Sequence, residues 1–139
     1  MSTPIPLAGV LGHPAAHSLS PRLHRHWLRR YALAGHYVPL EVAADDLRDV
    51  LATMPRMGFV GANVTIPHKE TVLRLCDLVT DRAALVGAVN TLIFRPDGKI
   101  HGDNTDVTAS SPICARPCPA GSRRPAPVRC SAPAAPLAP

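Results

Sequence analysis

The first hundred residues alternate short apolar runs with amphipathic segments. The run at 5–12 ends at Gly12 and has the length and composition of a buried strand. Ser20 followed by Pro21 is typical of a helix start with a side-chain cap, and we expect this helix to end before Gly35. Its apolar side chains share one face at helical spacing: Leu23, Trp27, Leu28 and Tyr31.

The alternation continues through the next seventy residues. Pro39 has no donor for a ladder hydrogen bond, so the strand that contains it belongs at the edge of a sheet. Pro96-Asp97-Gly98 is typical of a hairpin turn between two alternating strands. In chain order the pattern predicts a strand at 36–42, a helix capped by Asp45 or Asp46 and running to Met54, a strand at 59–65, a helix from Pro67 to about Leu75 and a helix at 80–86.

Strands that alternate with helices indicate an α/β fold. We therefore predict an open, three-layer α/β architecture with a mostly parallel sheet, to which the hairpin adds antiparallel edge strands. About 100 ordered residues would bury a modest core.

The composition changes after the hairpin. Residues 110–139 contain eight prolines and seven alanines, a density of proline that no helix or strand tolerates. We predict a folded domain at 1–108 and a disordered tail at 109–139. The tail carries four arginines and no acid, whereas residues 1–109 have a net charge of only +1. Without interleaved aromatic residues this tail does not favour specific nucleic-acid binding.

The same sequence argues against a membrane or metal role. Its N-terminus lacks the basic region of a signal peptide, and no apolar run reaches the roughly 18 residues that span a bilayer. Cys114 and Cys118 have no matching second pair, and His24 and His26 face different sides of their helix, so we expect no metal site. These features predict a cytoplasmic, reduced protein.

Polar side chains gather in four segments that follow strand ends, namely 17–20, 63–69, 88–91 and 102–106. Ligands bind beyond the carboxyl ends of the strands in open α/β sheets, so these segments could converge on one crevice. Such a set of hydroxyls and amides around one Lys and one Asp would satisfy a polyhydroxylated small molecule without a metal. The candidates are Ser18, Ser20, Asn63, Thr65, Lys69, Asn90, Thr91, Asn104, Thr105 and Asp106.

Each group also has a purely structural interpretation. Ser20 alone could be a helix cap, and Asn63, Asn90 and Asp106 could bond their own turns. Lys69 could be a solvated lysine. A cation in the first turn of a helix is mildly unfavourable, however, and this placement favours a functional explanation. We expect His68 to pack in the interior.

Four sequence motifs, in this order along the chain, favour the functional interpretation over the structural one. "GHPAAHSLSP", "GANVTIPHK", "GAVNTL" and "GDNTD" closely resemble the substrate-binding domain of shikimate dehydrogenases, over residues 5 to about 108. This family interconverts 3-dehydroshikimate and shikimate, a step of aromatic amino acid biosynthesis, with NADP. The resemblance implies a small-molecule substrate, whereas a homodimer is left open.

The resemblance also implies a role for each matching residue. Ser18 and Ser20 would hold the substrate carboxylate, and Lys69 and Asp106 would form the catalytic pair that also contacts the substrate. Two serines at 18 and 20 favour shikimate over quinate. The remaining pocket-lining positions implied by the resemblance are Asn63, Thr65, Asn90 and Thr91.

The family pattern stops after Asp106. The only later glycine is Gly121, so no G-x-G-x-x-G turn for the NADP pyrophosphate follows, and we expect the chain to be inactive alone. The alternative is a non-catalytic module that binds shikimate or quinate. The tail composition is typical of a frameshifted GC-rich gene, and translating the DNA in the other frames would test that interpretation. We also expect apolar surface that a longer family member covers to be exposed.

Overall fold

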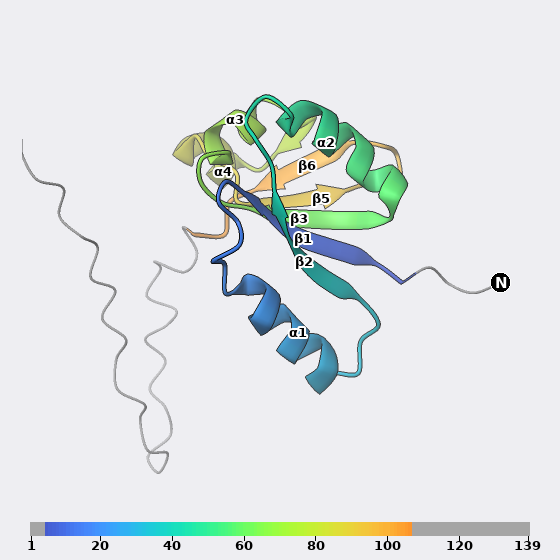
Figure 1. Cartoon of the computed structure of the whole chain (residues 1–139). Coiled ribbons are helices and arrows are strands. Elements are labelled where there is room, and N and C mark those ends of the chain that lie inside the picture. Colours follow the sequence, from blue (N-terminus) through green and yellow to red (C-terminus); the bar gives the residue numbers. More distant parts are fainter. Residues whose placement is uncertain (1–4, 107–139) are drawn as a thin grey trace, which may run out of the picture.

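In a computed structural model, residues 5–106 form a six-stranded sheet with helices on both faces (Figure 1). The strands are β1 (Leu7–Gly12), β2 (His36–Glu41), β3 (Phe59–Val64), β4 (Leu78–Val79), β5 (Thr91–Phe94) and β6 (Ile100–Asp103). The helices are α1 (Ser20–Arg30), α2 (Leu47–Thr53), the 3₁₀ helix η1 (Met54–Met57), α3 (Lys69–Leu73) and α4 (Asp81–Val86). The predicted α/β class is confirmed.

The sheet combines a parallel half with an antiparallel half. Its strand order is β2-β1-β3-β5-β6-β4, in which β1 pairs in parallel with β2 and β3. The hairpin strands β5 and β6 run antiparallel to each other, and β5 is antiparallel to β3. β2, which contains Pro39, lies at one edge as predicted. The hairpin does not form the other edge, because the two-residue strand β4 pairs in parallel with β6.

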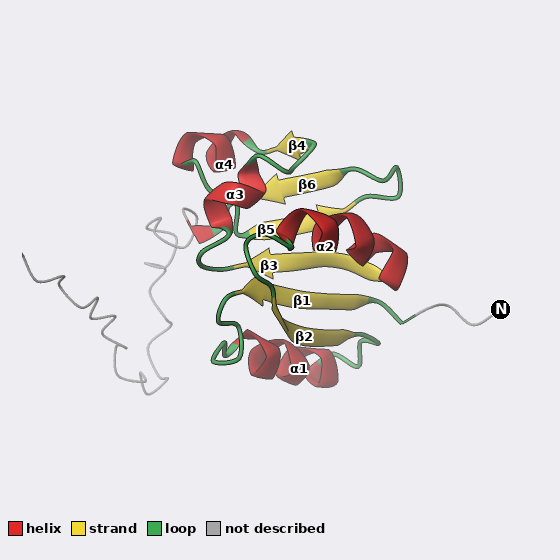
Figure 2. Cartoon of the chain, turned by 45° about the horizontal axis from the view of Figure 1, so that its top comes forward, coloured by secondary structure: helices red, strands yellow, loops and turns green. Residues whose placement is uncertain are grey.

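Helices cover the two faces of the sheet unequally. α2, α3 and α4 lie on one face, and α1 lies on the other, beneath β2 (Figures 1 and 2). The main core is between the sheet and α2 to α4, where Leu11, Leu47, Leu51, Met54, Val72, Val89 and Leu92 are buried. On the face of α1, Val60 and Ile93 stay 53% and 47% exposed.

α1 begins and ends differently from the prediction. It ends at Arg30 rather than before Gly35, because Ala32 has a left-handed φ of 51° and the Leu33 amide turns back to the Leu28 carbonyl. Ser20 is the first helical residue and not a cap. The N-cap position is Leu19, and no side chain caps this helix.

Two other helix starts also need correction. Asp46 occupies the N-cap position of α2, but its side chain accepts no capping hydrogen bond. α3 starts at Lys69, two residues after Pro67, because the His68 amide is used in a turn to the Thr65 carbonyl. At α4, by contrast, the hydroxyl of Thr80 accepts from the Ala83 amide and caps the helix.

Some sequence predictions fall outside the described residues. These are the domain boundary at 108, the disordered tail at 109–139, and the interpretation of Cys114 and Cys118. Within residues 5–106, no helix is long and apolar enough to cross a membrane.

Candidate active site

Lys69 and Asp106 meet at the edge of the sheet where β1, β3 and β6 end. The Lys69 Nζ donates a hydrogen bond to the Asp106 Oδ2 at 2.8 Å, across 37 positions of sequence. Lys69 opens α3 and Asp106 follows β6, so parallel strand ends bring them together. Their side chains are 32% and 61% exposed, and the pair therefore faces solvent, where a small molecule can reach it.

A buried asparagine fixes the backbone before Asp106. Asn104 is 2% exposed, and its Oδ1 accepts a hydrogen bond from the Asp106 amide at 3.0 Å. Its Nδ2 donates to the carbonyl of Ala88 at 2.9 Å. Both ends of this amide are satisfied, so the carboxylate is held relative to the 88–91 segment.

The surroundings keep Asp106 ionised. A hydrogen bond from Lys69 is the main cause that lowers the pKa of the Asp106 carboxyl, and partial desolvation opposes it. A hydrogen bond from the Asn90 side chain and the charge of Lys69 lower that pKa further. At neutral pH Asp106 is therefore a carboxylate that accepts the hydrogen bond from Lys69.

Asn63, Asn90 and Thr91 form one hydrogen-bonded group next to this pair. Asn63 and Thr91 face each other across β3 and β5, and the Asn63 Nδ2 donates to the Thr91 Oγ1 at 3.3 Å. The Thr91 hydroxyl donates to the Asn90 Oδ1 at 2.8 Å, and the Asn90 Nδ2 donates to the Thr105 Oγ1 at 3.1 Å. The structure thus brings these predicted site residues together.

The serine loop, residues 13–19 between β1 and α1, begins at the end of the sheet where β1 ends. The Ser18 Oγ accepts a hydrogen bond from the Ser20 amide at 3.3 Å, at the start of α1. The backbone of the loop is tied to the 63–69 segment by the His13 amide, which donates to the Ile66 carbonyl at 3.2 Å. Thr65 is half-buried in the turn after β3, where its methyl group lies close to Gly12.

Asp103, which the sequence analysis did not single out, anchors the segment that carries Asp106. Its carboxylate accepts hydrogen bonds from Thr80 at 2.6 Å, from the Asn104 amide at 2.7 Å and from Arg82 through two nitrogens. The pair with Arg82 lowers the pKa of Asp103 strongly, and hydrogen bonds from Thr80 and Asn104 add to this effect. A signal was present in the sequence, since Thr80 followed by Asp81 and Arg82 is a helix start with a cap.

We expect the Asp103 cluster to make the fold sensitive to acid. Its folded-state pKa is lowered, so its stabilisation is complete above the unfolded value of about 3.9 and is lost as pH falls below it. The urea midpoint should be level between about pH 7 and 5 and should decline below about pH 4. Asp103→Asn should lower the midpoint at neutral pH and flatten that decline.

Asp97→Asn is the matched control, because Asp97 lies in the exposed hairpin turn. It should keep the wild-type acid decline. An unchanged decline in Asp103→Asn would contradict the assignment of acid sensitivity to this cluster.

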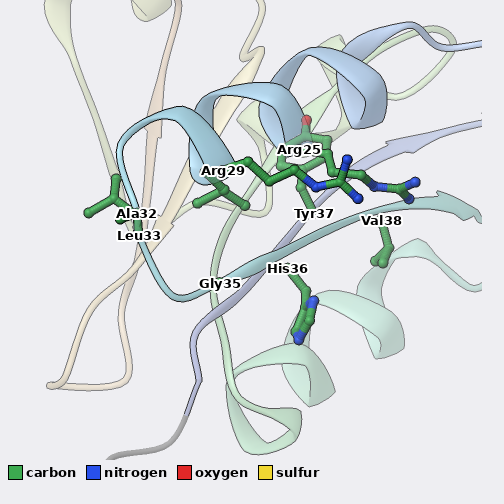
Figure 3. A pocket seen from close by; sticks show the side chains of 9 residues that line it. Arg25, Arg29, Ala32, Leu33, Gly35, His36, Tyr37 and Val38 are labelled. Atoms are coloured by element: carbon green, nitrogen blue, oxygen red, sulfur yellow. The ribbon is translucent and has the colours of Figure 1, made fainter.

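A groove between α1 and β2 is separate from these residues. It encloses about 470 Å³, and Arg25 and Arg29 extend along it from α1 (Figure 3). His36 and Tyr37 line it from β2, whereas neither Lys69 nor Asp106 takes part. The candidate active site is therefore the end of the sheet where β1, β3 and β6 end, and not this groove.

Two interior groups have structural roles. His68 is 1% exposed and its Nε2 lies 2.7 Å from the carbonyl oxygen of Val42, so the expected packing role is confirmed. Cys76 packs beside Gly102, and burial raises the pKa of its thiol to about 11. Residues 5–106 contain no cluster of three or more His, Cys, Asp or Glu that could hold a metal.

Comparison with known proteins identifies the fold that presents this arrangement. The family model of the shikimate dehydrogenase substrate binding domain matches residues 10–92. The chain belongs to this family. The matched residues include Lys69, whereas Asp106 lies beyond them.

Two relatives show the extent of the similarity. The shikimate dehydrogenase (NADP(+)) of Cereibacter sphaeroides strain KD131 is 74% identical over 106 residues, which are 76% of this chain and 38% of the relative. The protein of the same name from Paracoccus denitrificans is 73% identical over 101 residues, 73% of this chain and 36% of the relative. The chain thus spans less than two fifths of the length of these relatives.

Solved structures agree with the family and the fold. Shikimate 5-dehydrogenase from Thermus thermophilus, in complex with shikimate, superposes with a TM-score of 0.69 at 39% identity and covers 73% of this chain and 39% of its own. The same enzyme in complex with NADP(H) and shikimate gives the same score. Shikimate dehydrogenase from Aquifex aeolicus has a TM-score of 0.71 at 37% identity, over 76% of this chain and 40% of its own.

The described residues do not fit a dinucleotide. A pyrophosphate needs a glycine-rich turn between a strand and a helix, with backbone amides free to face it. Strand β1 is instead followed by Gly12-His13-Pro14, whose His13 amide is engaged with the Ile66 carbonyl. The turn after β1 therefore does not provide a site for the pyrophosphate of a dinucleotide.

Proposed function

We propose that this chain is the substrate-binding part of an NADP-dependent shikimate dehydrogenase and binds shikimate or 3-dehydroshikimate at the open sheet edge. The observation that carries the proposal is the Lys69–Asp106 ion pair at 2.8 Å, flanked by the amides of Asn63 and Asn90. A ring with several hydroxyl groups matches this set of alternating donors and acceptors.

The carboxylate of such a ligand would lie near Ser18 and Ser20. Their hydroxyls can donate hydrogen bonds to a carboxylate. The amide and hydroxyl groups around Asn63, Thr91 and Asn90 then face the ring hydroxyls. Recognition would depend on several neutral hydrogen bonds, together with one charged pair at the reacting alcohol.

The charged pair suits proton transfer at a secondary alcohol. When the alcohol is oxidised, its oxygen must lose a proton, and a carboxylate and an amine that both hydrogen-bond this oxygen can accept and return it. In the reducing direction the Lys69 ammonium donates to the oxygen as negative charge develops there. Asp106 keeps the ammonium oriented through the 2.8 Å hydrogen bond. The nicotinamide of the NADP-dependent relatives would supply the hydride, from outside residues 5–106.

A binding experiment tests the proposal on the 139-residue chain. Isothermal titration with shikimate should give saturable binding, and the methyl ester of shikimate should bind at least about ten-fold more weakly because it lacks the carboxylate charge. Ser18→Ala combined with Ser20→Ala should weaken shikimate binding and bring it close to that of the ester.

The serine pair at Ser110 and Ser111 offers a control, since it lies beyond the family match. Replacing both with alanine should leave shikimate affinity within about two-fold of the wild type. Absence of saturable binding by the wild-type chain would refute the proposal. Turnover by this chain alone when NADP is added would contradict the expectation that the chain is inactive alone.

A further inference from the structure

Tyr37 lies next to the site but belongs to none of its four sequence segments. It is 7% exposed in β2, and its phenol donates a hydrogen bond to the Asn63 Oδ1 at 2.7 Å. Its ring stacks on His24 of α1, with the ring centroids 4.0 Å apart and the planes 8° from parallel. The phenol is therefore held between a helix and the sheet, and aims at one atom of the site.

The hydrogen bonds around Asn63 fix which way its amide points. The carbonyl oxygen of Asn90 can only accept, so the Asn63 atom that faces it at 3.4 Å must be the nitrogen Nδ2. The oxygen Oδ1 consequently points to Tyr37, and the phenol must be the donor. Burial raises the pKa of Tyr37 to about 12, so the phenol keeps its proton at neutral pH.

The hydrogen bonds of Asn63 and Thr91 also determine how the side-chain amide of Asn90 is oriented. Because the Asn63 Nδ2 donates to the Thr91 Oγ1, the single proton of Thr91 is directed to the Asn90 Oδ1, at 2.8 Å. The amide of Thr105 also donates to that oxygen, at 3.0 Å. The Asn90 Nδ2 is left to face the Thr105 hydroxyl and the Asp106 carboxylate.

We propose that Tyr37 is a positioning residue for substrate recognition, whose phenol holds the Asn63 amide in the orientation that the Asn90 carbonyl also requires and so maintains the donor direction along Asn63, Thr91 and Asn90 toward Asp106. The phenol need not touch the substrate. Together with the Asn90 carbonyl, it fixes which atoms of the two amides are presented to ring hydroxyls. The inference rests on the proposed function of this site.

The test compares Tyr37→Phe with Tyr31→Phe in the full 139-residue chain. The first change retains the stacked ring and removes the phenol oxygen, whereas Tyr31 is 65% exposed and lies outside the site. Shikimate affinity should fall about ten-fold in Tyr37→Phe and change less than about two-fold in Tyr31→Phe. In ¹⁵N spectra of the ligand-free chain, the side-chain NH₂ signals of Asn63 and Asn90 should shift in Tyr37→Phe alone.

The outcomes separate this inference from the proposed function. If the wild type binds shikimate and Tyr37→Phe binds equally well with unchanged NH₂ signals, the positioning role is overturned while the function stands. If the wild type does not bind shikimate, the proposed function fails. The NH₂ signals then still test the positioning role: a shift in Tyr37→Phe supports it, and unchanged signals overturn it. Should Tyr37→Phe not fold, His24→Ala removes the ring that stacks on Tyr37 without removing a hydrogen bond of Asn63 or Asn90, and unshifted NH₂ signals of Asn63 would then overturn the positioning role.

Discussion

Lys69→Met should abolish most of the hydride-transfer activity of a complete enzyme built on this domain. The test enzyme is a chimera in which residues 1–106 replace the corresponding segment of the Cereibacter sphaeroides enzyme, which is 74% identical to this chain over 106 residues. Methionine keeps the length of the side chain but cannot donate to the substrate oxygen. Loss of a general acid–base group lowers rates by roughly 10²- to 10⁴-fold, and we expect kcat to fall by about that factor.

Lys99→Met is the matched control, because Lys99 is the other lysine of the chain and is exposed in the hairpin before β6. It should leave kcat and KM nearly unchanged. Initial rates of NADPH formation at saturating shikimate measure both variants. A Lys69→Met chimera that keeps a tenth or more of the parent kcat would contradict the proposed role of the pair.

Gly61→Ala should lower the melting temperature of the domain. Gly61 lies in β3 against β5, where a Cβ atom would overlap the backbone carbonyl oxygen of Leu92. Neither strand can move without disturbing the ladder that positions Asn63 and Thr91. We expect a loss of about 3 kcal/mol in the free energy of unfolding, which corresponds to a fall of roughly 15 °C in Tm.

Gly98→Ala separates this steric effect from the general cost of replacing glycine. Gly98 has a φ of 82° and open space around it, so only the left-handed backbone is penalised, at about 1 kcal/mol. Thermal unfolding followed by circular dichroism compares the two variants. Equal losses in both would show that the close approach at Gly61 is tolerated.

The sequence predicted the elements whose signal is local. Apolar runs between turn residues located β1, β2 and β3, Pro39 placed β2 at an edge, and the Pro96-Asp97-Gly98 turn located the hairpin. It also anticipated that strand ends would bring Lys69 and Asp106 together, because parallel strands end at one edge. The roles of these residues remain predictions.

The elements that the sequence missed depend on contacts between distant segments. β4 has two exposed residues, and its strand conformation comes from pairing with β6. The early end of α1 depends on a left-handed Ala32, a residue type without a preference for that conformation. The sequence indicates only that Tyr37 lies in a strand. Nothing in the neighbouring residues shows that its phenol reaches Asn63, 26 positions away.

The sheet order has a consequence for how the domain is made. The groups of the site extend from Ser18 to Asp106, and β5 and β6 must dock beside β3 before the last of them is in place. A ribosome-bound chain therefore cannot recruit the ligand until nearly the entire domain has emerged. Added ligand should accordingly slow amide hydrogen exchange in the central strands together, because only the fully assembled state holds it.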